Sequence, residues 1–285
     1  MPSWVLFPRL HLAEVEDQPW CPEWLREHTH RALARMWQTS NTANGSPATQ
    51  ASTLLLRALG GPKNAAQFTF IDACAGSGGP TPLLEPAVNA KLTDKGYPPV
   101  EFILTDLRPD MEAWEGITKR SEHISFIREP IDATRPQRLA KPGTKECRLF
   151  HLCFHHFDDP AAEQVLASAV QSTDAFMIFE MTHRTLPSLL NTTIVILSCL
   201  ITTIFDFYWS PLHLLCTYII PIVPLFYAID GYVSCIRGRT AEEISALLQR
   251  QQPKLNLDGW EFNSGEQTAL LPFGKMYWYS GVKKT

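Results

Sequence analysis

The sequence predicts an α/β fold built around a parallel β-sheet that helices cover on both faces. Five short apolar runs carry this prediction: 68–71, 100–104, 125–127, 148–152 and 175–179. Apolar and polar residues do not alternate within these runs, which is typical of strands buried on both faces, and segments of helical length separate them. Acidic or small residues follow each run, and parallel sheets bind their ligands beyond the carboxyl ends of the strands.

The flanking segments predict an amphipathic helix over 20–38, a loop over 39–50, a short helix over 51–59, a capped helix over 240–250, and closing strands over 259–266 and 275–283. Pro22 suits the first turn of a helix, and Thr240 with Glu243 forms the pattern of a capping box. We therefore divide the chain into an N-terminal helical cap (1–60), a core (61–183), an apolar helical insertion (184–237), and a closing helix and strand pair (238–285).

The charge balance excludes some functional classes. The 285 residues include 25 Lys and Arg against 29 Asp and Glu, a formal charge of −4, with no stripe of basic residues. Nucleic acid is therefore not an expected partner. The seven cysteines form no CxxC pair and no zinc-ligand spacing, so we expect buried thiols in a reducing compartment. The N-terminus lacks the pattern of a secretory signal.

A glycine-rich loop follows the first predicted strand. The segment Asp72-Ala-Cys-Ala-Gly-Ser-Gly-Gly-Pro80 lets the backbone turn sharply and approach a ligand closely. It is not the phosphate loop of nucleoside triphosphatases, because no Lys follows the glycines. A dinucleotide-dependent dehydrogenase is disfavoured, because Cys74 stands at the first glycine of the spaced triplet. The loop alone therefore indicates only a nucleotide-like ligand.

Carboxylates at the next strand ends narrow the choice of ligand. Asp106 follows the second strand, where a carboxylate can accept hydrogen bonds from both hydroxyls of a ribose. Asp132-Ala133 follows the third, where a carboxylate and a small neighbour can meet an adenine amino group. In this order the motifs resemble those of class I S-adenosylmethionine-dependent methyltransferases, over about residues 68–183 and again in the closing strand pair. The resemblance implies a Rossmann-like, seven-stranded sheet with an antiparallel last strand, and S-adenosylmethionine as cofactor.

The resemblance also assigns the cofactor-binding residues. It implies that Asp72 and Gly76–Gly78 line the methionine part, Asp106 the ribose, and Asp132 and Ala133 the adenine, with Ala73, Cys74, Ser77, Leu107, Cys153 and Phe154 as further contacts. Two features depart from the family pattern: Cys74 replaces a glycine, and Asp106 lies 34 residues after Asp72, further than usual. Segments 17–26, 72–80 and 230–237 are similar to a subgroup of microbial and fungal small-molecule methyltransferases that carry an apolar insertion.

The catalytic candidates lie after the fourth and fifth strands: His155, His156, Glu180 and His183. A histidine titrates near neutrality, so it could accept a hydroxyl proton or orient a carboxylate. Because side chains alternate along a strand, at most one of the two adjacent histidines is expected to face the acceptor. The alternative is that these residues are structural, with Glu180 to His183 opening a helix.

A metal site is a further alternative for the segment His155-His-Phe-Asp-Asp159. It is disfavoured because adjacent histidines diverge on a strand. In addition, Asp158-Asp159-Pro160 is typical of the start of a helix, where acidic residues are stabilised by the helix dipole. We therefore predict no metal ion.

The 45 residues between Arg184 and Asp230 carry one formal charge, Asp206. The runs 186–205 and 207–229 each reach the ~20 residues that span a bilayer core, although both contain polar residues or prolines. Strands on both sides must join one sheet, so a single crossing is impossible. Two crossings, a re-entrant hairpin, or a lid folded over the active site remain.

We expect this insertion to associate with a membrane through 186–229, with the catalytic domain on the cytosolic side. Asp206 would then mark the tip of a hairpin, and Arg184, Arg237 and Arg239 would stand at its base, in line with the positive-inside tendency. The alternative is a cytoplasmic protein whose insertion is a lid.

The expected activity is transfer of a methyl group from S-adenosylmethionine to oxygen, in a carboxylate or hydroxyl of a small lipophilic metabolite such as a terpenoid or polyketide. The insertion would border the acceptor, with the helix over 20–38 opposite, which indicates a lipophilic acceptor. Oxygen is favoured over nitrogen because no Asn-Pro-Pro-Tyr-like motif follows the fourth strand. Two alternatives stay open: a cyclase or isomerase that uses the cofactor only structurally, and a membrane-associated binding protein without catalysis.

Overall fold

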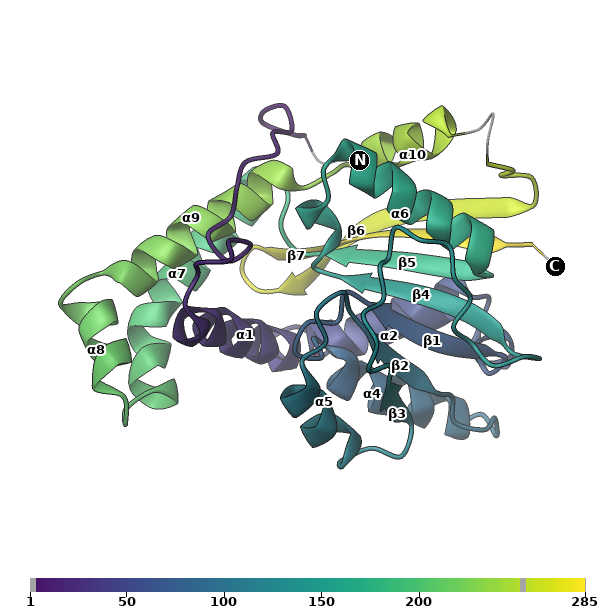
Figure 1. The fold of residues 1–285 in the computed structure, drawn as a ribbon, viewed down its shortest axis with the longest axis horizontal. Coiled ribbons are helices and arrows are strands. Elements are labelled where there is room, and N and C mark those ends of the chain that lie inside the picture. The colour runs from purple at the N-terminus through teal and green to yellow at the C-terminus, as the bar shows by residue number, and fades with distance from the viewer. Residues whose placement is uncertain (1–3, 252–254, 285) are drawn as a thin grey trace.

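The computed structural model describes residues 4–251 and 255–284. Its centre is one sheet of seven strands in the order β3-β2-β1-β4-β5-β7-β6 (Figure 1). The strands are β1 (Phe68–Ala73), β2 (Phe102–Thr105), β3 (Ile124–Phe126), β4 (Lys145–His151), β5 (Ala175–Glu180), β6 (Trp260–Leu270) and β7 (Gly274–Lys283). The first five are parallel, whereas β7 runs antiparallel to both β5 and β6. The predicted fold class is confirmed, including the reversed closing hairpin.

Helices cover both faces of this sheet. One face carries α2 (Pro47–Ala58), α4 (Thr81–Thr93) and α5 (Met111–Thr118), and the other carries α6 (Asp159–Ser172) and α10 (Ala241–Arg250); α3 (Pro62–Ala65) is a single turn before β1. Strand β5 shows why its run is apolar throughout: Met177 packs into the first helical layer, whereas Phe176 and Ile178 pack into the second. The capping box of Thr240 and Glu243 at the start of α10 is also confirmed.

The two N-terminal helices start at other residues than the sequence predicted. Helix α1 (Glu23–Gln38) begins at Glu23 rather than residue 20, and α2 begins at Pro47, inside the predicted loop. Ser46 caps α2, because its Oγ accepts a hydrogen bond from the Thr49 N–H at 3.3 Å. A proline fits the first turn of a helix, where no partner for its missing N–H is needed, so this Ser-Pro pair starts a helix.

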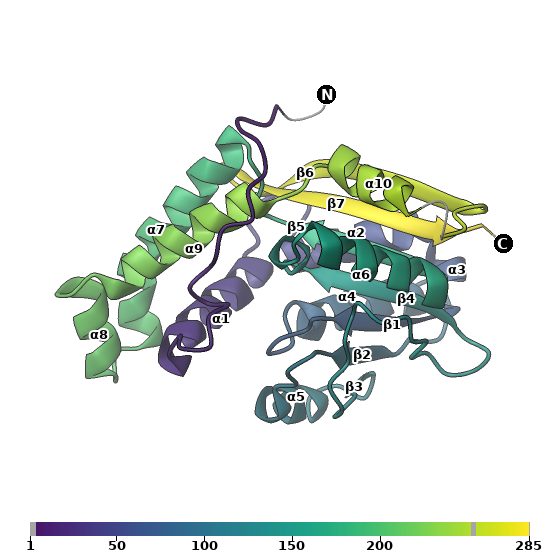
Figure 2. The same cartoon turned by 45° about the horizontal axis from the view of Figure 1, so that its top comes forward.

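The apolar insertion forms a helical lobe, which consists of α7 (Leu186–Asp206), α8 (Pro211–Tyr218) and α9 (Ile222–Arg237). The lobe projects beyond the carboxyl ends of the parallel strands (Figures 1 and 2). Helix α7 is long and apolar enough to cross a membrane. The second apolar run is not one helix, because α8 and α9 meet at 70° near Pro221, which lacks an N–H to continue α8.

Residues 4–22 form an N-terminal strap, which runs without helical structure along α9 to the start of α1 (Figure 2). Asp230 of α9 accepts hydrogen bonds from the N–H groups of Val15, at 2.7 Å, and Glu16, at 2.8 Å. Arg9 donates to the carbonyl oxygens of Phe157 and Arg237. The strap is therefore packed against α9 of the lobe and against the segment that follows β4.

The three arginines expected at the base of the hairpin do lie there, beside the start of α7 and the end of α9, but their side chains are buried in the protein. Arg184, Arg237 and Arg239 are buried, and they donate hydrogen bonds to carbonyl oxygens of Phe7, Leu12 and Phe154 respectively. Each also pairs with a carboxylate. They hold the strap and the lobe against the sheet, because buried carbonyls and carboxylates need donors.

Candidate active site

The glycine-rich loop leaves β1 in backbone conformations that favour glycine. Gly76 has φ +52° and Gly78 has φ +106°. A Cβ at Gly78 would overlap the Ile117 side chain, so this glycine lets α5 pack closely against the loop. A Cβ at Gly76 would meet no atom within 4 Å, so open space lies beside the backbone there. Cys74 also has a positive φ, +61°, at the position where a glycine is usual.

The two acidic strand ends lie in loops beside this space. Asp106 accepts hydrogen bonds from the N–H groups of Gly76, at 2.9 Å, and Arg108, at 2.8 Å. Leu107 next to it is 57% exposed. Asp132 accepts hydrogen bonds from both the hydroxyl and the N–H of Thr134, which lower the pKa of its carboxyl group. Ala133 and Cys74 pack against the same buried cluster, and the Ile131 N–H donates to the Asp106 carbonyl oxygen at 2.8 Å, so the ends of β1 and β2 and the loop after β3 meet at one place.

Asp72 is buried beneath the loop rather than on its surface. Its Oδ1 lies 3.0 Å from Nδ1 of His151, and its Oδ2 accepts a hydrogen bond from the Thr81 hydroxyl at 2.5 Å. The carboxylate therefore ties β1 to β4 and to α4. Ala73, Cys153 and Phe154 are also buried, and the Cys153 thiol lies 3.7 Å from the Ala73 carbonyl oxygen.

Helix α1 covers the loop from the other side. The Ser77 hydroxyl donates to Asp110 at 2.7 Å and lies 3.1 Å from Nδ1 of His30, a residue of α1. No sequence pattern indicated this contact, because His30 and Ser77 lie far apart in the chain.

The two adjacent histidines point in the same direction, contrary to the sequence prediction. Strand β4 ends at His151, Leu152 takes a positive φ of +52°, and Phe154–His156 form a 3₁₀ turn. Successive residues of such a turn are rotated by about 120°, not by the 180° of a strand. The rings of His155 and His156 are therefore neighbours, with centroids 4.3 Å apart.

His155 and Glu180 form a buried hydrogen-bonded pair. Nδ1 of His155 lies 2.8 Å from one carboxylate oxygen of Glu180, and the His155 backbone N–H donates to the other oxygen at 3.1 Å. Burial favours the neutral imidazole, but the charge and hydrogen bond of Glu180, together with the charge of Glu14, outweigh it and raise the pKa of His155 above 6.5. Glu180 thus fixes both the orientation of this ring and its proton affinity.

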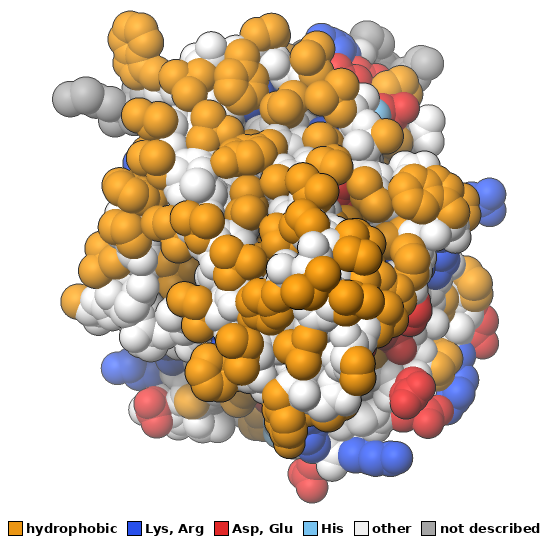
Figure 3. Space-filling model, turned by 90° about the vertical axis from the view of Figure 1, so that its left-hand side faces the viewer, with side chains coloured by type: hydrophobic (Ala, Val, Ile, Leu, Met, Phe, Trp, Pro, Cys, Tyr) orange, Lys and Arg blue, Asp and Glu red, His pale blue; other side chains and the backbone are white. Residues whose placement is uncertain are grey.

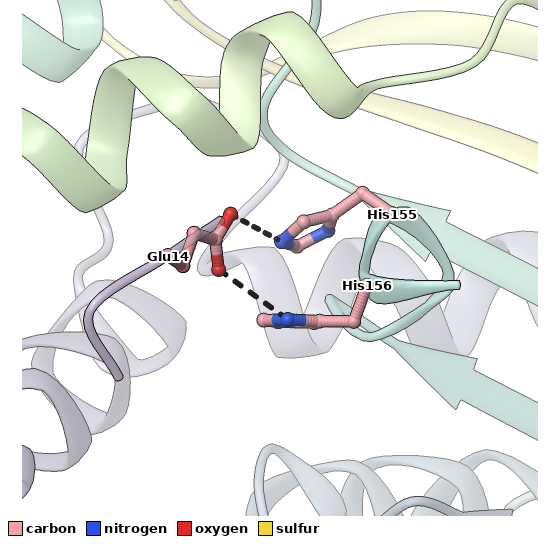
Figure 4. Close-up of side chains that lie close together, drawn as sticks. All are labelled: Glu14, His155 and His156. Atoms are coloured by element: carbon pink, nitrogen blue, oxygen red, sulfur yellow. Dashed lines mark ion pairs between the residues drawn. The ribbon is translucent and has the colours of Figure 1, made fainter. Parts of the chain in front are cut away.

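Glu14 of the strap completes the cluster (Figure 4). It is only 2% exposed, and its two carboxylate oxygens lie 3.9 Å from Nε2 of His155 and 3.3 Å from Nδ1 of His156. Arg237 pairs with it at 3.2 Å, and the Ser234 hydroxyl donates to it at 2.9 Å. No sequence pattern pointed to Glu14, because it lies in an irregular segment far from the strand ends.

Glu14, His155 and His156 bring three metal-ligand atoms within 4.8 Å of one another. Arg237 already supplies a cation here, at 3.2 Å from Glu14 and 3.4 Å from Nδ1 of His156. A divalent ion among these atoms would be repelled by the guanidinium, so the cluster is better described as a proton and ion-pair network. Asp158 and Asp159 take no part, because Asp158 caps α6 and Asp159 pairs with Arg9 and Arg239.

A cavity of about 160 Å³ lies against this network. His155, His156 and Glu14 form its polar side, and α1, α7 and α9 supply apolar walls that include Leu33, Val195 and Phe226. The apolar insertion and α1 thus border the same cavity. His183 does not line it, since its ring stacks on Tyr277 with centroids 4.6 Å apart, and burial lowers its pKa.

No protein-family model and no curated protein sequence matches the chain. Among solved structures, magnesium protoporphyrin IX methyltransferase from Synechocystis PCC 6803 with bound S-adenosylhomocysteine has a TM-score of 0.50 at 12% identity, covering 92% of this chain and 97% of that one. The citrinin polyketide synthase CMeT domain has a TM-score of 0.51 at 13% identity, with coverages of 95% and 60%.

The complex of LepI with S-adenosylmethionine matches 76% of this chain at 14% identity and a TM-score of 0.42, and the chain spans 43% of that protein. Sequence identities this low show a shared fold, but they do not show a shared substrate or reaction. Sheet order, the reversed last strand and the matches to methyltransferases agree. The chain therefore has the class I S-adenosylmethionine-dependent methyltransferase fold.

Proposed function

We propose that this protein is an S-adenosylmethionine-dependent O-methyltransferase that acts on small lipophilic acceptors. One observation carries the proposal: His155, held by Glu180, lines a cavity with apolar walls, and α1 borders both this cavity and the glycine-rich loop. A base beside an apolar cavity, with one helix shared between this cavity and the loop, suits methyl transfer to an acceptor oxygen whose proton must be removed.

The residues at the loop fit the cofactor. The open space at Gly76 admits a ligand against the backbone, Asp106 would hold the ribose hydroxyls, and the exposed Leu107 with Ala133 would flank the adenine. When bound, S-adenosylmethionine supplies an electrophilic methyl group. Asp72 would act indirectly, by holding the first turn of the loop in place from below.

His155 would supply the base. In the tautomer that carries its proton on Nδ1, His155 donates a hydrogen bond to Glu180, and Nε2 can then take a proton from an acceptor hydroxyl or orient an acceptor acid. The charges of Glu180 and Glu14 then stabilise the imidazolium, as in other buried histidine–carboxylate pairs. The apolar walls exclude water, which would otherwise solvate the acceptor oxygen.

The volume of the cavity limits the size of the acceptor that it can hold. At about 160 Å³ it is smaller than typical ligand pockets, which start at roughly 300 Å³. Glu14 and Glu16 of the strap line it, so displacement of the strap would enlarge it. A terpenoid- or polyketide-sized acceptor would thus enter by moving the strap.

Asp106→Ala is expected to weaken S-adenosylhomocysteine binding by about tenfold or more, because two hydrogen bonds to a charged group are lost. Isothermal titration measures the dissociation constant. Asp94→Ala, which removes the same charge from the exposed end of α4, serves as the control and should leave affinity unchanged. Undiminished binding by Asp106→Ala, or no binding by the wild type, would count against the cofactor assignment.

The pH dependence of methyl transfer should report the raised pKa of His155. The base acts when neutral, so kcat/KM should fall as pH drops through a midpoint above 6.5. In Glu180→Gln, burial dominates and the midpoint should move to lower pH. Glu16 also lines the cavity, and burial raises its pKa to about 7, so Glu16→Gln is the control that should keep the wild-type midpoint. If Glu16→Gln shifts the pH midpoint of kcat/KM and Glu180→Gln does not, the titrating group is Glu16 and His155 is not the base.

A further inference from the structure

We propose that the outer face of the helical lobe is a bilayer-docking surface, which enters one leaflet of a lipid membrane without crossing it. Large apolar side chains stand out from all three helices of the lobe. Six of them are between 48% and 73% exposed: Leu197, Ile201, Phe205, Ile219, Leu225 and Ile229. Figure 3 shows this face as a broad apolar surface with the charged side chains gathered at its lower and right-hand margins.

The near absence of charge on the outer face of the lobe is compatible with contact with the hydrocarbon of a membrane. The lobe has one acidic residue between Arg184 and Asp230, and this residue, Asp206, is paired with Arg35 of α1. The outer face therefore presents no unpaired charge from residues 185–229. Charged side chains cost about 2.5–3.5 kcal/mol each at the centre of a membrane, so their absence removes the main barrier to insertion.

The shape of the surface favours lipid over a second copy of the chain. The apolar side chains of this face come from all three helices of the lobe and form one broad surface, whereas a two-fold dimer contact covers a single self-complementary patch. Protein interfaces also carry about one hydrogen bond per 100–200 Å², and this face offers few polar side chains for them. The turn between α7 and α8 exposes Tyr208 and Trp209, side chains that favour the interface between lipid and water.

Contacts on the inner side of the lobe explain why it does not cross the bilayer. The Tyr227 hydroxyl donates to the His28 carbonyl oxygen at 2.8 Å, and the Arg31 guanidinium lies 4.8 Å from the Phe207 ring. Together with the Arg35–Asp206 pair, these contacts fasten α1 to α9 and to the C-terminal end of α7. Crossing would bring the charges of α1 into hydrocarbon, whereas docking of the outer face leaves them in water.

Flotation with phosphatidylcholine vesicles tests this surface. The wild type should float with the vesicles, and the double variant Ile201→Lys/Ile219→Lys should lose binding by about tenfold or more. The control Ala90→Lys/Gln249→Lys adds the same charge to exposed positions of α4 and α10 and should float like the wild type. Because an apolar face binds, replacing part of the lipid with phosphatidylserine should change binding little.

Several outcomes would overturn the proposal. One is a wild type that stays with the soluble fraction and forms a dimer that the two lysines dissociate, which makes the face a protein interface. Equal flotation of both double variants would exclude these positions from docking. Binding that requires phosphatidylserine would show an electrostatic surface instead. Crossing would be shown by glycosylation, in microsomes, of an acceptor loop inserted between Tyr208 and Trp209. S-adenosylhomocysteine titration of each variant reports folding separately, so failure of docking leaves the proposed activity untouched.

Discussion

His155→Gln is expected to lower the rate of methyl transfer about 10²–10⁴-fold, the usual contribution of a positioned general base. The loss should appear in kcat, because the side chain acts on the acceptor proton and does not lie among the residues assigned to the cofactor. Glutamine keeps an amide N–H that can still donate to Glu180, so the fold around the pair should persist. The rate is measured with an acceptor found by screening isoprenoid and polyketide acids and alcohols.

Two further variants make this result specific. His123→Gln changes a partly exposed histidine outside the cavity and should retain the wild-type rate. His156 lines the same cavity but has Asp17 at 2.9 Å and Glu14 at 3.3 Å from the same nitrogen, so His156→Gln should cost less than His155→Gln. The reverse order of losses would assign the base to His156. Full activity of both variants would exclude base catalysis by this pair.

Arg237→Ala is expected to destabilise the fold by about 3–5 kcal/mol, the range for removing one partner of a buried ion pair. The Arg237 side chain is 3% exposed and holds Glu14, Asp17 and the Leu12 carbonyl oxygen of the strap. Its loss leaves the Glu14 carboxylate buried beside two histidines without its cation. Urea unfolding of the wild type and the variant gives the difference in unfolding free energy.

The matched control is Arg250→Ala, which breaks an exposed pair with Glu163 and should cost about 0–1 kcal/mol. Adding Glu14→Gln to Arg237→Ala removes the unpaired charge and should recover part of the loss. If Arg237→Ala cost no more than Arg250→Ala, the strap would not be held by this network.

The sheet and the cofactor loop could be predicted because their signals are local. Buried strands such as 175–179 are apolar on both faces, and a loop such as Asp72–Pro80 carries its glycines in sequence. The turn at Leu152 could not be predicted from a local sequence pattern. The positive φ of Leu152 follows the last residue of β4 and precedes the 3₁₀ turn that makes the rings of His155 and His156 neighbours, and no glycine marks that position.

The strap could not be predicted for a different reason. Glu14 and Arg237 lie far apart in the sequence, and only the packing of the strap against α9 brings them together. The segment 230–237 nevertheless resembles a motif of the methyltransferase subgroup, and three of its charged or polar residues, Asp230, Ser234 and Arg237, all bind the strap. The same packing buries the three arginines at the base of the lobe, where each pairs with a carboxylate.

The most direct test of the proposed activity follows carbon-14 from the methyl group of S-adenosylmethionine. The purified protein is incubated with the labelled cofactor and a lipophilic acceptor that it consumes, and the product is isolated. We expect one labelled methyl group per product molecule, formed together with S-adenosylhomocysteine, and a large loss of label in His155→Gln. A product that forms without label would instead show a cyclase or isomerase, and would contradict methyl transfer as the function of this site.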